Sequence, residues 1–223
     1  MAKKVVATLQ TGKGRHYAKV IKMVKSPKTG AYTFKEEIVR VEIPAKKGAV
    51  TWFDTDEPPR RETNLETLAK LRPAFLADGS VTAGNAPGLC DGAAAVVVAN
   101  RARAVALGLE PLASVVGYTQ AALAPRYLFD APAHAIPRLL EKVGWSLAQV
   151  DLIELNEAFA AQILADGYAL ADQGWDWDKV NVNGGAIALG HPLGASGARV
   201  LTTLIHALKD RKLKRGIASL CLG

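Results

Sequence analysis

The stretch that most constrains this chain is residues 181–197, NVNGGAIALGHPLGASG, in which five glycines surround one histidine. Glycine adopts positive φ readily and lets the backbone come close to another group. Pro192 follows His191 directly and favours an extended or turn conformation at the histidine. The pattern predicts a strand over residues 180–189, a break at His191 and a helix that restarts near Ser196. We therefore expect His191 to sit on a rigid turn with an open face.

Two other interpretations of this stretch remain open from the residues alone. It could be a packing turn with no chemical role, or it could be a loop that binds phosphate. The phosphate interpretation is weak because the stretch contains neither GKS or GKT, as in a P-loop, nor GxGxxG, as in a dinucleotide turn.

The size of the chain and its two cysteines limit the class of protein. With 223 residues the chain can bury a substantial core. No apolar run approaches the roughly 18–20 residues of a membrane span, and no secretory signal follows Met1, so we expect no membrane partner. Cys90 and Cys221 make no disulfide framework, which favours a cytoplasmic location. Their spacing fits neither CxxC nor HExxH, so we expect no metal site.

The positive charge of the chain is concentrated in its first segment. Residues 1–48 hold 12 of the 28 lysines and arginines but 3 of the 21 acidic residues, a net charge of +9. This segment reads as short β-ribbons, with strands near residues 5–9, 17–24 and 31–43. A lysine-rich ribbon could contact nucleic-acid phosphates, although a solvated basic edge is the simpler interpretation.

Strands and helices are predicted to alternate through residues 90–223, which indicates an α/β layered domain. Helices are expected over residues 65–71, 101–107, 133–143, 158–171 and 198–208, with Asn64 as a cap. Strands are expected over residues 112–119, 150–155, 180–189 and 216–220, and residues 93–99 should form a buried strand or helix. Ligands lie off the carboxyl ends of strands in such sheets. Asn156, His191 and Cys221 come at such ends.

These three side chains suit thiolate chemistry, because an imidazole lowers a thiol pKa and holds the proton. The Asn156 carboxamide can donate to a water or to a developing oxyanion. Structural alternatives remain for each. Cys221 could be a small buried hydrophobe, and Asn156 could cap the helix that begins near Ala158. Cys90, within an apolar segment of small residues, is expected to be packing.

Three ordered motifs then carry a family resemblance. NEAFA at residues 156–160, NVNGGAIALGHPLGASGAR at residues 181–199 and CLG at residues 221–223 resemble the thiolase family. The similarity continues back through VTAGNAPGLCDGAAAVVV and LETLAKLRPAF to about Phe34. It implies the C-terminal half of an enzyme that transfers acyl groups between coenzyme A thioesters, by Claisen condensation or thiolysis.

The resemblance implies a role for each matching residue. His191 would activate the acylated nucleophilic cysteine and polarise the thioester carbonyl. Cys221 would be the acid and base for the α-proton. Asn156 would hold a water that completes an oxyanion hole with His191, the backbone N–H of Gly223 would serve a second hole, and Phe159 would line the acyl pocket.

The resemblance also implies the coenzyme A contacts. Arg60 and Phe75 would lie along the nucleotide, and Ala86 and Pro87 along pantetheine, although Pro87 replaces a serine that is usual in the family. Coenzyme A thioesters would be substrates, with no cofactor. Family members are longer and form dimers or tetramers, so a homo-oligomer is expected. Their first half carries the nucleophilic cysteine, and nothing here replaces it.

The sequence predicts three parts. Residues 1–38 would be a basic β-ribbon foreign to thiolases, residues 39–95 a remnant of the coenzyme A-binding loop region with a linker, and residues 96–223 a thiolase C-terminal domain truncated at its end. Residues 1–33 loosely resemble small basic bacterial ribosome-associated proteins, through KKVVATLQTGKG. We expect the chain alone to be inactive in acyl transfer, with no turnover, and to expose surfaces that normally pack against the missing half. The alternatives are an RNA- or ribosome-binding fusion module and a non-catalytic acyl-CoA-binding protein.

Overall fold

The computed structural model describes residues 20–25, 32–37, 41–44, 50–53, 60 and 62–221. The chain divides into two units, residues 1–59 and 60–223. In the first unit, β1 (Val20–Lys25) pairs antiparallel with β2 (Tyr32–Glu37), and β3 (Val41–Pro44) pairs antiparallel with β4 (Val50–Phe53). Antiparallel ribbons are present as predicted, but β2 and β3 stand where one strand was expected over residues 31–43, and β4 lies beyond the predicted ribbon segment. The strand expected near residues 5–9 lies outside the described residues. The predicted three-part division stays a prediction.

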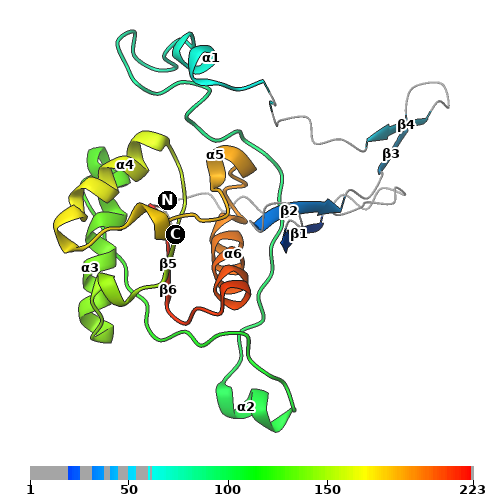
Figure 1. Cartoon of the computed structure of the whole chain (residues 1–223), viewed down its shortest axis with the longest axis vertical. Coiled ribbons are helices and arrows are strands. Elements are labelled where there is room, and N and C mark those ends of the chain that lie inside the picture. The colour runs from blue at the N-terminus through cyan, green and yellow to red at the C-terminus, as the bar shows by residue number, and fades with distance from the viewer. Residues whose placement is uncertain are drawn as a thin grey trace. The chain divides into compact units, whose positions relative to one another are not determined.

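The second unit is layered around a short parallel sheet. β5 (Leu152–Leu155) pairs with β6 (Gly216–Ser219) in parallel, from Leu152 opposite Gly216 to Leu155 opposite Ser219. The helices α3 (Ala131–Val143) and α4 (Ala160–Ala169) cover one face, and α6 (Ser196–Arg211) covers the other (Figure 1). This arrangement confirms the predicted α/β layers.

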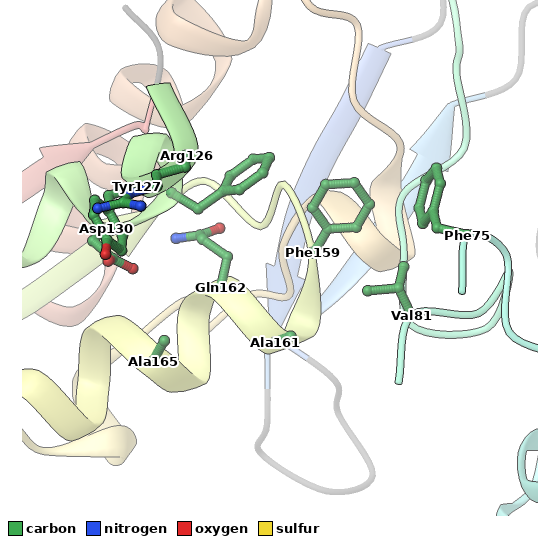
Figure 2. Close-up of a pocket in the computed structure, with 10 residues that line it drawn as sticks. Phe75, Val81, Arg126, Tyr127, Asp130, Phe159, Ala161, Gln162 and Ala165 are labelled. Carbon is green, nitrogen blue, oxygen red and sulfur yellow. The ribbon is translucent and has the colours of Figure 1, made fainter. Parts of the chain in front are cut away.

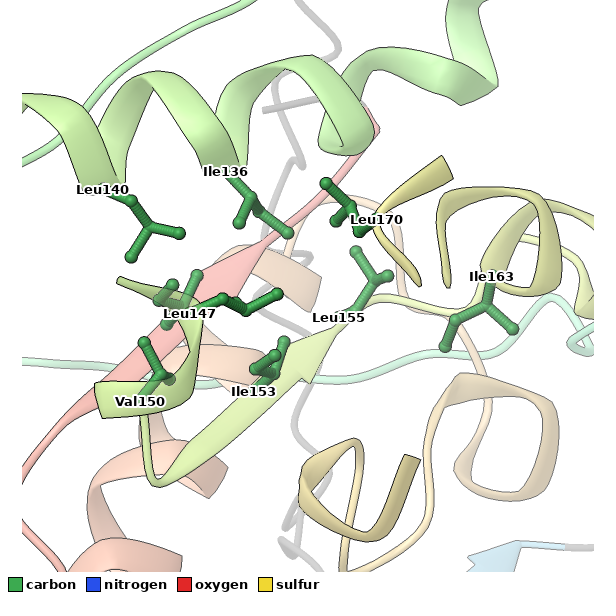
Figure 3. Packing of buried hydrophobic residues seen from close by; sticks show 9 residues of the cluster. Ile136, Leu140, Leu147, Val150, Ile153, Leu155, Ile163 and Leu170 are labelled. Atoms are coloured by element: carbon green, nitrogen blue, oxygen red, sulfur yellow. The ribbon is translucent and has the colours of Figure 1, made fainter. Parts of the chain in front are cut away.

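The core follows from the alternation of β5, since successive side chains of a strand point to opposite faces. Ile153 and Leu155 are each 1 % exposed and pack toward α3 and α4, whereas Leu152 packs toward α6. Glu154, between them in sequence, therefore shares the α6 face with Leu152. The first cluster comprises Ile136, Leu140, Leu147, Val150, Ile153, Leu155, Ile163, Leu170 and Ile217 (Figure 3). Full burial of such a side chain contributes about 1.5–3 kcal/mol.

The remaining helices are short and lie between these layers or outside them. α1 (Leu65–Ala69) has the predicted Asn64 cap, because the Asn64 side chain accepts from the Thr67 N–H at 2.9 Å. The others are α2 (Arg101–Ala106), α5 (Ala186–Leu189), η1 (Pro125–Asp130), η2 (Leu147–Gln149), η3 (Ala171–Gln173) and η4 (Trp177–Lys179). In the part of the chain that is described, no helix has the length and apolarity that crossing a membrane requires.

The strand predicted over residues 180–189 is wrong. Val180 makes one isolated parallel bridge with Ile153, and the chain then turns away at Asn181, whose φ is 45°. The Asn181 carboxamide continues the ladder instead, since it accepts from the Leu155 N–H and donates to the Leu155 carbonyl, both at 2.8 Å. After Asn181 the chain forms α5 within the predicted strand.

The predictions for residues 93–99 and 112–119 are also wrong. Neither segment forms a helix or a strand, and both expose apolar side chains. Val97 is 98 % exposed and Val115 is 75 % exposed. A strand needs a neighbour for its backbone hydrogen bonds and a surface for its side chains. The described residues supply neither to these two segments.

Candidate functional site

Asn156 and His191 meet at the carboxyl end of the sheet. Asn156 follows β5 directly and is 1 % exposed, and its backbone N–H donates to the Ser219 carbonyl on β6 at 2.9 Å. Its side-chain Nδ2 lies 3.4 Å from Nε2 of His191. The helix-capping alternative for Asn156 is wrong, because α4 begins at Ala160 and its N-cap residue is Phe159. The structure thus brings two of the predicted site residues together.

The tautomer of His191 follows from its other neighbour. Nδ1 of His191 lies 2.7 Å from the hydroxyl of Ser196, and that hydroxyl donates to the Pro192 carbonyl at 3.1 Å. A hydroxyl has one hydrogen, so the Ser196 oxygen accepts and Nδ1 carries the imidazole proton. Nε2 is then the acceptor and faces the Asn156 NH2 group. Burial, and then the nearby Arg199 charge, lower the pKa of His191, which favours this neutral ring.

The loop that carries His191 is held by Glu157. The Glu157 carboxylate accepts from the Ile187 N–H at 2.9 Å and from Asn181 Nδ2 at 3.0 Å. A side chain at Gly185 would collide with this carboxylate. Gly190 has φ 94° and lies against the Cys90 sulfur, so it could not carry a side chain either. Two of the glycines in the stretch are therefore needed for close approach, as the sequence predicts.

Cys221 lies at the same end of the sheet. It comes two residues after Ser219, the residue whose carbonyl accepts from Asn156, so the chain between them spans at most about 7 Å. Cys221 is 9 % exposed. Cys90 is exposed, so the prediction that it is packing is wrong: its apolar segment is not covered. Gly223 lies outside the described residues.

Phe159 lines a cavity of about 630 Å³ (Figure 2), and the lining includes none of Asn156, His191 and Cys221. Its ring makes edge-to-face contacts with Phe75 and Phe129, with centroids 6.2 Å and 5.3 Å away. Phe75 and Phe159, expected along the nucleotide and in the acyl pocket respectively, therefore border one cavity. The other lining residues are Val81, Arg126, Tyr127, Asp130, Ala161, Gln162 and Ala165.

Ala86 and Pro87 are fixed at both sides by backbone hydrogen bonds. The Asn85 carbonyl accepts from the Ala160 N–H at 2.9 Å, and the Gly88 carbonyl accepts from the His191 N–H at 3.2 Å. The two residues are half-buried and lie in a segment that links the start of α4 to the histidine. Arg60 is exposed at the start of the second unit.

Two charged residues behind the site were not predicted from the sequence. Nη2 of Arg199, on α6, donates to Oδ1 of Asn156 at 3.4 Å. Glu154 is 2 % exposed, and burial raises its pKa to about 7 despite the charges of Arg199 and Arg211. The sequence did contain a signal for Glu154, because an acidic residue inside an apolar strand is almost never fully buried unless it is paired. Arg199 follows Ser196 by three residues and so shares its helix face.

The arrangement can bind and polarise an oxygen rather than a metal. Within the described residues, no three His, Cys, Asp or Glu side chains are grouped so as to hold a metal ion. The Asn156 NH2 group is a fixed donor, the imidazole can take or return a proton at Nε2, and the Cys221 thiol lies at the neighbouring strand end. Donors held in place before reaction stabilise developing charge without reorganisation.

Comparison with known proteins gives two family matches. Residues 109–223 match the thiolase C-terminal domain, and residues 2–43 match a domain of unknown function, DUF4295. The acetyl-CoA acetyltransferase of Pseudomonas aeruginosa is 56 % identical over 190 residues, which cover 85 % of this chain and 48 % of the relative. That of Allochromatium vinosum is 54 % identical with the same coverage.

Solved structures of acetyl-CoA acetyltransferases and thiolases are also similar to this chain. The acetyl-CoA acetyltransferase of Bacillus anthracis superposes with a TM-score of 0.74 at 50 % identity and covers 84 % of this chain and 46 % of its own. Human mitochondrial 3-ketoacyl-CoA thiolase gives 0.69 at 40 % identity, with 82 % and 46 % covered. The chain thus spans about half the length of the curated relatives it matches. Through its C-terminal domain, this chain belongs to the thiolase family.

Proposed function

We propose that residues 60–223 supply the proton-transfer part of a thiolase active site, which acts on acyl-CoA thioesters. The observation that supports this most is the contact between Asn156 and His191 at the sheet end where Cys221 also lies. Removal of a thioester α-proton needs a base and donors that stabilise the enolate oxygen, because that proton is weakly acidic, and a thiol and a carboxamide can fill these two roles.

In this proposal the cavity beside Phe159 receives the acyl-CoA. The Cys221 thiolate takes the α-proton, and negative charge moves to the thioester oxygen. Asn156, through a bound water, stabilises that oxygen. His191 would add a second donor once Nε2 has taken the proton of the nucleophilic cysteine, which the other half of the enzyme would provide. Return of the proton from Cys221 regenerates the thioester, so the exchange step needs no other reactant.

Acyl transfer would need a second cysteine to accept the acyl group. The relatives are about twice as long as the matched region, and we propose that the corresponding other half supplies it. The exposed apolar segments 93–99 and 112–119 would pack against that half. We further propose that the assembled protein is a homo-oligomer, as the thiolase resemblance implies, and that it is cytoplasmic, which its two cysteines suit.

Exchange of the acetyl protons tests the proton-transfer role directly. Acetyl-CoA in D2O with the 223-residue chain should lose its methyl proton signal in NMR, and Cys221→Ser should slow that loss by about 100-fold, typical of a lost acid–base group. Cys90→Ser is the matched control and should exchange like the wild type. Equal exchange by Cys221→Ser and the wild type would refute the role of Cys221.

Thiolysis separates proton transfer from acyl transfer. The chain alone should not cleave acetoacetyl-CoA in the presence of coenzyme A, because no acyl-accepting cysteine is provided. Detectable cleavage by the purified chain, measured as acetyl-CoA formed, would show that the 223 residues already contain a nucleophile.

The first segment suggests a second, separate function. Its charge of +9 over residues 1–48 could bind RNA phosphates. RNA affinity that falls steeply with salt and survives removal of residues 49–223 would support this function. No binding at low salt would rule it out.

A further inference from the structure

We propose that Arg199 is a positioning residue of this site, which turns the Asn156 carboxamide so that its NH2 group, and not its oxygen, faces His191. The proposal deepens the proposed function, because it concerns the same three groups. It concerns the orientation of one side chain, however, and can be tested without substrate. It can therefore fail while the proposed function stands.

The geometry of α6 places Arg199 where it can do this. Arg199 follows Ser196 by one turn, so the two side chains share a face of the helix. Ser196 holds Nδ1 of His191, and Arg199 holds Oδ1 of Asn156 at 3.4 Å. One turn of one helix thus fixes both partners of the Asn156–His191 contact.

The reverse orientation of the carboxamide is unfavourable for two reasons. A guanidinium has only donors, so the Asn156 NH2 group would face the donors of Arg199 and would have no acceptor there. The Asn156 oxygen would then face Nε2 of His191, which has no hydrogen because Nδ1 carries the proton. With Arg199 in place, each of the four contacts that run from Arg199 through Asn156, His191 and Ser196 to Pro192 pairs a donor with an acceptor.

A structural ion pair does not account for Arg199. Its Nε and Nη1 atoms are buried and have no hydrogen-bond partner among the described residues, and neither has Oε1 of Glu154. Glu154 lies 2 % exposed on the α6 face of β5 and offsets part of the arginine charge, as does Glu157. Desolvated charges without hydrogen bonds lower the stability of a fold. We therefore infer that the role of Arg199 is the hydrogen bond from its Nη2 to Oδ1 of Asn156.

The charge of Arg199 acts in the same direction as its hydrogen bond. It disfavours a second positive charge on the ring, and together with burial it lowers the pKa of His191. Three more charged groups surround this pair: Glu154 on β5, Glu157 after it, and Arg211 at the end of α6. The neutral ring keeps Nε2 available as the acceptor that the Asn156 NH2 group needs.

NMR on the full chain tests the orientation. In the wild type, the Asn156 side-chain NH2 protons should show nuclear Overhauser contacts to the His191 ring. Arg199→Gln should raise the titration midpoint of His191 and shift the Asn156 NH2 signals, and Arg199→Lys should restore both, because it keeps the charge and a donor. Arg138→Gln, on the exposed side of α3, is the matched control and should change neither signal.

Either of two results would overturn the proposal. The first is the absence, in the wild-type chain, of any nuclear Overhauser contact between the Asn156 NH2 protons and the His191 ring. This result does not depend on whether a variant folds. The second is a folded Arg199→Gln chain in which both signals stay as in the wild type. The proposal would also be overturned if Arg199→Lys changed the His191 titration midpoint and the Asn156 NH2 signals as Arg199→Gln does.

Discussion

Two regions of the second unit are similarly apolar but packed very differently. Residues 131–221 form the layers around β5 and β6, with Ile153 and Leu155 almost fully buried. Residues 89–118 expose Leu89, Val97, Val98, Val105, Leu107, Leu109, Leu112, Val115, Val116 and Tyr118. Composition alone would assign both regions to a core.

The difference lies in whether a partner surface is present. Each face of β5 meets a helix whose apolar stripe covers it, so alternate strand residues are buried on both sides. The segments at residues 93–99 and 112–119 have the apolar residues of buried strands but no covering element among the described residues. Exposed apolar patches are typical of interaction sites. The contrast is therefore consistent with the proposal that these segments pack against the other half of the enzyme.

The same substitution in the two regions should separate them most. Leu155→Ala removes a side chain that is 1 % exposed and should lower the free energy of unfolding by about 3 kcal/mol. Leu112→Ala removes one that is 63 % exposed and should change it by less than about 0.5 kcal/mol. Urea denaturation measures both. Similar losses at the two positions would show that residues 89–118 are packed in solution.

Glu154 adds a pH dependence that belongs to the packed region alone. Because burial raises its pKa to about 7 in the folded chain, the fold binds the proton more tightly than the unfolded chain does, and stability falls as pH rises from about 4.5 to 7. The loss is on the order of 2 kcal/mol between pH 5 and pH 8. Glu154→Gln should reduce it, as measured by urea denaturation at both pH values, whereas Glu141→Gln, exposed on α3, should not. An unchanged pH dependence in Glu154→Gln would contradict the assignment.

Gly185 tests how closely the histidine loop is packed. A methyl group there would displace the Glu157 carboxylate that holds Ile187 and Asn181, so Gly185→Ala should cost about 1–2 kcal/mol. Gly197→Ala, in the first turn of α6, meets nothing within 4 Å and should be neutral or slightly stabilising. Thermal unfolding of both variants measures these changes in stability. A Gly185→Ala chain as stable as the wild type would mean that the carboxylate can move aside.

The smallest effect is expected at α1, which buries none of its residues. Asn64→Ala removes a cap worth about 1 kcal/mol to the helix. The global free energy of unfolding should change by less than about 0.5 kcal/mol, because the core does not depend on α1. Hydrogen exchange should speed up at Leu68 and its neighbours and stay unchanged at Ile153. A drop in global stability of about 1 kcal/mol would place α1 within the cooperative core.

Much of the packed region could be predicted from its sequence. α3, α4, α6, β5 and β6 all have the expected type, since their apolar periodicity matches the faces that they bury. Asn156 and His191 do meet, although the strand that was expected to carry His191 does not exist. The contact follows from the placement of Asn156 after β5 and of His191 on the loop before α6, which both lie at the carboxyl end of the sheet. The functional roles of these residues stay predictions.

What could not be predicted depends on partners rather than on local pattern. Asn181 replaces a strand because its carboxamide happens to fit the backbone of Leu155, and no propensity encodes that. Residues 93–99 and 112–119 read as buried, since the pattern reports what a segment can bury and not whether the covering surface is present. Arg199 was missed because its role depends on the orientation of another side chain.

The carboxamide of Asn181 makes the sheet border unusually intolerant of change. Aspartate there would present an acceptor to the Leu155 carbonyl, and glutamine would reach one methylene too far, so chemically close replacements all break the pairing. Because the same side chain also meets Glu157, which accepts from the Ile187 N–H, one amide joins the edge of the sheet to the first part of the histidine loop, whereas Gly88 and Ser196 hold His191 itself. A replacement at Asn181 would therefore displace residues 181–187 before it reached the imidazole.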